Sequence, residues 1–156
     1  MNITLLWTGK TTASYLETGI GLYLKRLEHY VPFEVVTLPD IKRAHLTEEQ
    51  QKTLEGEALL QRLQPGDRVV LLDEKGKTFT SEAFARQLGS WMTTGVRRLA
   101  FVIGGPYGFS EAVYRRAEHM MSLSAMTFSH QMVRLIFAEQ LYRAFTILRG
   151  EPYHHA

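Results

Sequence analysis

Short apolar runs alternate with segments of helical periodicity along most of this chain. The runs lie at 3–7, 33–38, 68–72 and 99–103; helical spacing of apolar residues follows the first and third runs, and helix-capping residues follow the second and fourth. Runs of this length are typical of buried strands, because both faces of such a strand are covered. The pattern therefore predicts an α/β fold with a mostly parallel sheet flanked by helices.

Three sequence signals place the boundaries of these helices. Thr47 followed by Gln50 is typical of a capping box, which opens a helix. Pro65 ends that helix, because proline cannot continue it. Ser110, followed by Glu111, predicts the start of another helix after the fourth strand.

The last predicted helix, from about His130 to Leu148, is apolar on more than one face. Its apolar side chains are Met132, Val133, Leu135, Ile136, Phe137, Leu141, Phe145, Ile147 and Leu148. A helix of this kind is buried on two sides. Either another part of the chain or a second subunit covers the second side, and we expect a homodimer.

Composition limits the class of protein. The chain has 156 residues, of which 45% are hydrophobic, so we expect one domain over residues 1–156. It has no cysteine, which excludes disulfides and is compatible with a reducing cytoplasm. We find no apolar run of membrane-spanning length and no export signal, so we expect a cytoplasmic protein without a membrane partner.

Several chemistries are disfavoured by the spacing of the residues. Gly9-Lys10-Thr11 and Gly76-Lys77-Thr78 resemble the end of a phosphate-binding P-loop, but its first glycine is replaced by Thr4 and Leu71. The histidines do not form a recognisable metal-binding pair, and we expect no metal. The formal charge of +2 does not by itself indicate nucleic-acid binding.

Two segments are candidates for a binding site. Residues 103–110 read Ile-Gly-Gly-Pro-Tyr-Gly-Phe-Ser and join a buried strand to a helix, where ligands bind in open α/β sheets. Pro106 lacks an N–H, so this turn suits a flat, weakly charged ligand better than phosphate. Residues 123–129, Leu-Ser-Ala-Met-Thr-Phe-Ser, precede the last helix. Taken singly, the first segment is equally well a tight turn, and the second is core with Ser129 as a helix cap.

Taken together, these motifs resemble the RlmH family of SPOUT-class methyltransferases. The resemblance covers essentially the whole chain and includes the apolar strand ending at Asp73, the glycine turn, residues 138–144 and the terminal Glu-Pro-Tyr-His. It implies an α/β SPOUT fold with a deep C-terminal trefoil knot within about 71–156, although chains rarely thread loops. It also implies a homodimer that methylates N3 of a pseudouridine in large-subunit ribosomal RNA, with S-adenosylmethionine (SAM) as methyl donor.

The resemblance assigns candidate site residues. The SAM pocket corresponds to Leu72, Gly104, Leu123, Ser124, Ala125, Met126, Thr127 and Phe128. Tyr153 and His154 in the tail are the candidate catalytic residues, unless the tail is only a disordered terminus. The family commonly has Lys or Arg where this chain has His155, which replaces a permanent cation with a titratable group.

Three functions stay open at this point. The first is methylation of ribosomal RNA on the assembled ribosome, which the resemblance favours. The second is methylation of another RNA, such as tRNA, by a SPOUT enzyme. The third is a ribosome-binding protein of the same fold without catalysis, and SAM binding separates it from both enzymes.

Overall fold

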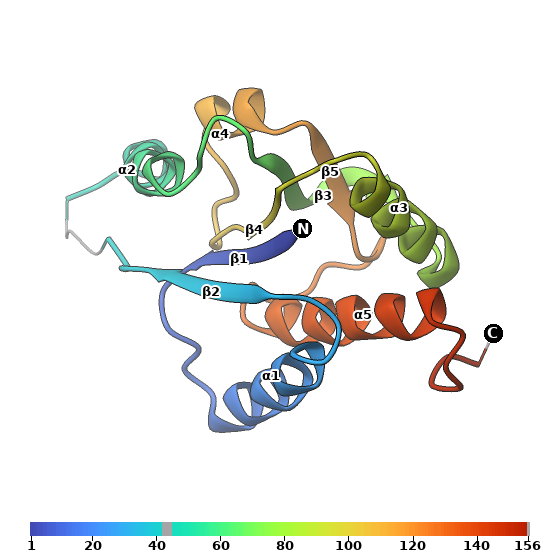
Figure 1. The fold of residues 1–156 in the computed structure, drawn as a ribbon. Helices are drawn as coiled ribbons and strands as arrows, with labels where there is room; N and C mark the ends of the chain where they lie inside the picture. Colours follow the sequence, from blue (N-terminus) through green and yellow to red (C-terminus); the bar gives the residue numbers. More distant parts are fainter. Residues whose placement is uncertain (42–44, 156) are drawn as a thin grey trace.

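Strands and helices alternate along the whole chain (Figure 1). The computed structural model describes residues 1–41 and 45–155. The strands are β1 (Asn2–Thr8), β2 (Phe33–Leu38), β3 (Arg68–Thr78), β4 (Arg98–Ile103) and β5 (His119–Ser122). The helices are α1 (Ser14–Leu27), α2 (Glu48–Gln61), α3 (Ser81–Thr93), α4 (Glu111–Arg116) and α5 (Met132–Leu148). The strands form one parallel sheet in the order β2-β1-β4-β3-β5, which confirms the predicted fold class.

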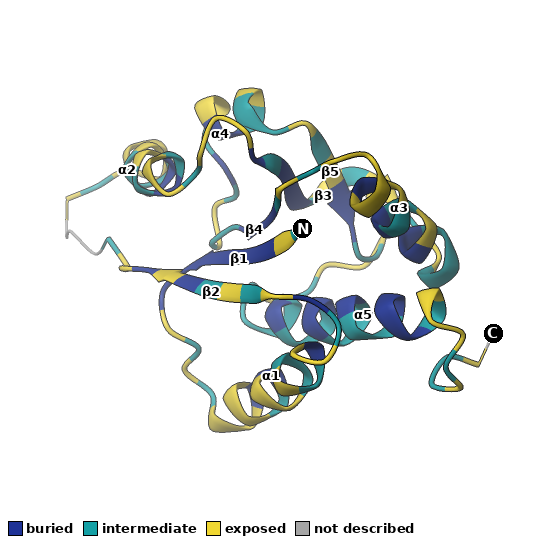
Figure 2. Ribbon diagram, in the orientation of Figure 1, coloured by how far each residue is buried: buried dark blue, intermediate teal, exposed yellow. Residues whose placement is uncertain are grey.

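The sheet separates two hydrophobic cores. On β4, Leu99, Phe101 and Ile103 contribute to the larger core, whereas Ala100 and Val102 contribute to the smaller one. Helices α1, α3 and α5 cover the first face, and α2 and α4 cover the second (Figure 2). Successive side chains of a strand point to opposite faces, and both faces are covered here. This explains why the strands are continuous apolar runs in the sequence.

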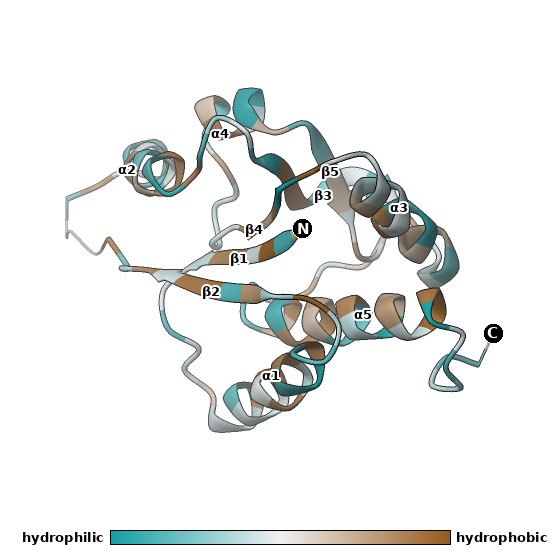
Figure 3. Ribbon diagram, viewed as in Figure 1, coloured by the Kyte–Doolittle hydropathy of each residue, from teal (hydrophilic) through white to brown (hydrophobic). Residues whose placement is uncertain are grey.

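Helix α5 packs between α1 and α3 against the sheet. Figure 3 shows hydrophobic residues along this helix and along β1. Residues Phe137, Leu141 and Phe145 are almost completely buried. The two neighbouring helices cover much of the apolar surface of α5 within one chain, whereas Ile136 is only partly buried and Leu148 is exposed. The helix begins at Met132, slightly later than predicted.

The predicted helix caps are present. Thr47 Oγ1 accepts a hydrogen bond from the Gln50 N–H at 3.1 Å, and the Thr47 N–H donates to Gln50 Oε1 at 2.9 Å. The Ser110 hydroxyl accepts from the Val113 N–H at the start of α4. The cap of α3 is Thr80, which we did not predict. Local sequence therefore sets these helix starts, because a cap needs only neighbouring residues.

The edge of the sheet differs from the prediction. Strand β3 continues past residue 72 to Thr78, and β5 was not predicted at all. The register of β3 against β5 shifts between Leu72 and Lys77, which marks an irregularity in the ladder. At Gly76, an added Cβ would lie 2.5 Å from the backbone nitrogen of Met121, so glycine is needed for the close approach of the two strands. β5 has only four residues and depends on this pairing.

Arg134 ties the beginning of α5 to the loop after β1. Its side chain is almost fully buried, and it donates to the carbonyl oxygens of Thr8 at 2.7 Å and Gly9 at 2.8 Å. It also donates to Thr11 Oγ1 and lies over the ring of Trp7, 5.1 Å from its centroid. Burial lowers the pKa of Arg134 to about 10, which leaves it charged at neutral pH.

We predict that Arg134→Met destabilises the fold by about 3 kcal/mol, because two main-chain carbonyls lose their charged donor in a buried place. Chemical denaturation of the full chain measures this change. Arg86→Met is the matched control, since Arg86 is exposed on α3. Equal unfolding midpoints for the two variants would contradict the anchoring role of Arg134.

Candidate active site

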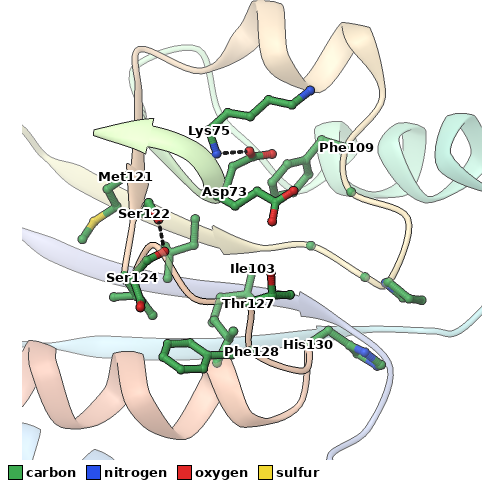
Figure 4. A pocket seen from close by; sticks show the side chains of 18 of the residues that line it. Asp73, Lys75, Ile103, Phe109, Met121, Ser122, Ser124, Thr127, Phe128 and His130 are labelled. Carbon is green, nitrogen blue, oxygen red and sulfur yellow. Dashed lines mark hydrogen bonds between the residues drawn. The ribbon is translucent and has the colours of Figure 1, made fainter. Parts of the chain in front are cut away.

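A cavity of about 390 Å³ lies beside the irregular part of β3, the ends of β4 and β5, and the start of α5 (Figure 4). Cavities at the carboxyl ends of parallel strands are the usual ligand sites of open α/β sheets. Its volume falls within the range of small-molecule and cofactor pockets. The location agrees with the site expected from the strand-to-helix turn.

The cavity brings together the residues predicted to hold the cofactor, with one exception. Those that line it are Leu72, Gly104, Leu123, Ser124, Met126, Thr127 and Phe128. Ala125 is exposed and lies outside the lining. The Met126 N–H donates to the Ser124 hydroxyl at 2.9 Å, and this short turn leaves Ala125 at its tip. Positions far apart in the sequence thus meet at one cavity.

The glycine segment is both a tight turn and a wall of the cavity. Gly108 has a positive φ of 82° and donates its N–H to the carbonyl oxygen of Gly105 at 3.2 Å. At Gly104, an added Cβ would lie 3.1 Å from ring atoms of Phe109, which is itself buried. The two interpretations of this segment are therefore compatible, since the turn is what brings the backbone of Gly104 to the ligand space.

Serine side chains hold the loop between β5 and α5. The Ser122 hydroxyl donates to the carbonyl oxygen of Ser124 at 2.8 Å. The Ser129 hydroxyl accepts from the Met132 N–H at 3.1 Å, but the N-cap of α5 is Gln131 and not Ser129 as the core interpretation predicted. These local hydrogen bonds replace regular secondary structure over this stretch and fix the side chains that face the cavity.

Asp73 and Tyr114 form a polar part of the cavity wall that we did not predict. The Tyr114 hydroxyl donates to Asp73 Oδ2, and Asp73 Oδ1 accepts from the Lys75 N–H at 2.8 Å. Burial and the hydrogen bond to Asp73 raise the pKa of Tyr114 to about 12, so the phenol stays protonated. Asp73 directly follows the last buried residue of the predicted strand, and this position at the strand end could have identified Asp73 as a residue of the site. Tyr114 could not be found in this way, because only the packing of α4 brings it there.

The start of α5 adds residues that the sequence did not assign to the pocket. His130 and Val133 both line the cavity. His130 was interpreted only as part of the first turn of its helix. Residues 1–41 and 45–155 contain no group of three or more His, Cys, Asp or Glu side chains placed to hold a metal ion. None of the helices within these ranges has the length and hydrophobicity that crossing a membrane requires.

The candidate catalytic residues of the tail lie outside this cavity. Figure 1 shows the chain end beyond the C-terminal end of α5, whereas the cavity lies where α5 begins. The Tyr153 hydroxyl donates to Glu139 Oε1 at 3.0 Å, and its ring meets the edge of Tyr142 with centroids 4.8 Å apart. His154 Nε2 lies 2.8 Å from Glu82 Oε1. These contacts fix the tail against α3 and α5.

The hydrogen bonds of His154 assign its tautomer. Arg143 lies 3.0 Å from Nδ1, and because a guanidinium only donates, Nδ1 must accept. The proton is then on Nε2, which donates to Glu82, and this hydrogen bond lowers the pKa of the Glu82 carboxyl. Burial raises the pKa of Tyr153 well above its ordinary value. In this arrangement, Tyr153 is a donor and both nitrogens of His154 are occupied.

Comparison with known proteins identifies the family. Residues 1–154 match the model of a family described as predicted SPOUT methyltransferase. The protein named ribosomal RNA large subunit methyltransferase H of Parabacteroides distasonis is 60% identical over 99% of both chains. The proteins of the same name from Christiangramia forsetii and Flavobacterium johnsoniae are 58% and 56% identical, also over 99% of both chains. The chain thus belongs to the RlmH family of SPOUT methyltransferases.

Proposed function

We propose that this protein methylates N3 of a pseudouridine in large-subunit ribosomal RNA, with SAM as methyl donor, on assembled ribosomes in the cytoplasm. The observation that carries the proposal is that the glycine turn and the loop before α5 line the same cavity. The full-length similarity to proteins named as large-subunit ribosomal RNA methyltransferases supports the choice of substrate.

The cavity fits SAM chemically. Leu72, Ile103 and Phe128 supply apolar wall for an adenine ring, and Gly104 leaves room for close approach of a ligand to the backbone. Asp73 supplies a carboxylate beside a ligand that carries positive charge. When bound, SAM would supply a methyl group on a positively charged sulfur; as the N3–methyl bond forms, the sulfur–methyl bond breaks, the neutral thioether leaves, and the N3 proton passes to a base or to water. The residues of the chain have to hold the acceptor nitrogen in line with that group and to exclude water, and such positioning lowers the barrier substantially.

We propose that Tyr153 and His154 take part in catalysis in the cavity of a second copy of the chain. Within one chain they are held away from the cavity by Glu139 and Glu82. A homodimer in which each tail reaches the cavity of the partner would bring the two groups to the reacting base. A tyrosine hydroxyl is protonated at neutral pH, so Tyr153 can serve as a hydrogen-bond donor to the acceptor base.

The family resemblance also supports a knotted arrangement within about residues 71–156. The knot and the homodimer are parts of this proposal.

Methyl transfer from radiolabelled SAM tests the function directly. Assembled ribosomes and free large-subunit RNA are taken from cells that lack the endogenous enzyme, and tRNA is included as a third substrate. We expect label in large-subunit RNA, most of it when the RNA is in ribosomes. Label in tRNA alone would indicate a different SPOUT activity, and SAM binding without transfer to any RNA would contradict the proposal.

We predict that Gly104→Val lowers SAM affinity by roughly tenfold or more, because the new side chain crowds the ring of Phe109, which also lines the cavity. Isothermal calorimetry measures the affinity, and circular dichroism shows that the variant is folded. Gly66→Val is the control, since an added Cβ at Gly66 meets nothing within 4 Å. Unchanged affinity in the Gly104 variant would remove this residue from the pocket.

A mixing experiment tests the exchange of tails between copies. We expect Gly104→Val and a Tyr153→Phe, His154→Ala double variant each to be nearly inactive. Random reassortment of the two should restore about a quarter of the sites, because half of the dimers are mixed and each mixed dimer has one intact site. If each tail served its own cavity, mixing would restore nothing.

A further inference from the structure

Two large side chains at the rim of the cavity are exposed. Tyr107 is 43% exposed and Met126 is 77% exposed. Among the large hydrophobic residues that are exposed in the described part of the chain, only these two also line the cavity. They come from different segments, the glycine turn and the loop before α5. Exposed apolar side chains beside a ligand cavity indicate a surface for a partner or substrate.

Local contacts hold the backbone both at Tyr107 and at Met126. Tyr107 lies inside the turn closed by Gly105 and Gly108, directly after Pro106. The fixed φ of proline and the closing hydrogen bond restrict the turn, so the tyrosine ring is presented from a defined position. The Met126 N–H is already engaged by the Ser124 hydroxyl, and its side chain faces outward. The two residues are therefore positioned without using their side chains.

We propose that Tyr107, supported by Met126, forms the stacking surface for the target base of the RNA. This inference rests on the proposed function and deepens it by assigning residues to the recognition of the base. It assigns Tyr107 at the rim to the acceptor base, with Met126 bordering both this base and the proposed methyl-donor pocket.

The chemistry of the acceptor requires such a surface. N3 of a pyrimidine lies on its pairing edge, so the base has to be unpaired and turned out before a methyl group can reach that nitrogen. An unpaired base exposes both ring faces, and proteins commonly bind these faces by stacking on aromatic side chains. A flexible thioether adapts to the second side of such a ring. The rim thus has one rigid aromatic group and one adaptable apolar group.

Substitutions that distinguish the contributions of the aromatic ring, the apolar surface and the hydroxyl of Tyr107 test the proposal. For Tyr107→Leu we expect a loss of roughly tenfold or more in kcat/KM for ribosomes, mainly through KM, because stacking on the ring is lost. Tyr107→Phe keeps the ring and should retain activity. Met126→Ala should give a smaller loss. Met92→Ala, an exposed methionine on α3 away from the cavity, is the control and should match the parent protein.

SAM affinity, measured by calorimetry on the two Tyr107 variants, distinguishes the rim from the cofactor pocket, because Tyr107 is not among the predicted SAM-pocket residues whereas Met126 is. We expect the SAM affinity of both Tyr107 variants to stay within about twofold of the parent value, a difference well below one factor of ten in affinity. Equal kcat/KM for Tyr107→Leu and the parent would overturn the proposal, as would a parallel loss of SAM affinity. An inactive parent protein that still binds SAM would instead overturn the proposed function itself, and the stacking role with it.

Discussion

The buried guanidinium of Arg134 joins two segments on which the rest of the structure depends. It donates to the main-chain oxygens of Thr8 and Gly9, where β1 ends, from the first turns of α5. Because α5 is packed between α1 and α3, this contact sets where the helix begins relative to the sheet. His130 and Val133, at that same end of α5, form part of the cavity wall. The Arg134 charge, which is costly to bury, therefore lies at the end of α5 that forms part of the cavity wall.

The cavity itself results from three departures from regular structure. The ladder between β3 and β5 shifts in register, the turn after β4 is closed by glycines, and the loop before α5 is held by serine hydroxyls. At each departure, side chains or strand pairing are missing from space that a regular sheet would fill, and this space is the cavity. Gly76 and Gly104 occupy positions where a Cβ would approach neighbouring atoms closely. The glycines therefore have a steric role at the site.

The tail shows how a chain terminus is ordered by polar contacts. Tyr153 and His154 engage Glu139, Arg143 and Glu82 through hydrogen bonds of 2.8 to 3.0 Å. Arg143 also pairs with Glu139 one helical turn earlier, so the tail docks onto an ion pair that is already formed on α5. The sequence also allowed a disordered terminus, and for the described tail, up to residue 155, that prediction is wrong. Within one chain, both residues are therefore engaged by partners on α3 and α5.

The sequence by itself determined the class of fold and the caps of α2 and α4, and its resemblance to a known family indicated most of the residues that line the cavity. Apolar runs and caps such as Thr47 and Ser110 depend on neighbouring residues, and the motifs around Gly104 and Phe128 are recognisable as strings. Only the tertiary structure decided that β5 forms at the sheet edge, that α5 is covered by α1 and α3, and that Asp73 meets Tyr114. It also decided that the tail lies apart from the cavity of its own chain. These features depend on contacts between residues far apart in the sequence, and local pattern carries no information about which distant partner a side chain will meet.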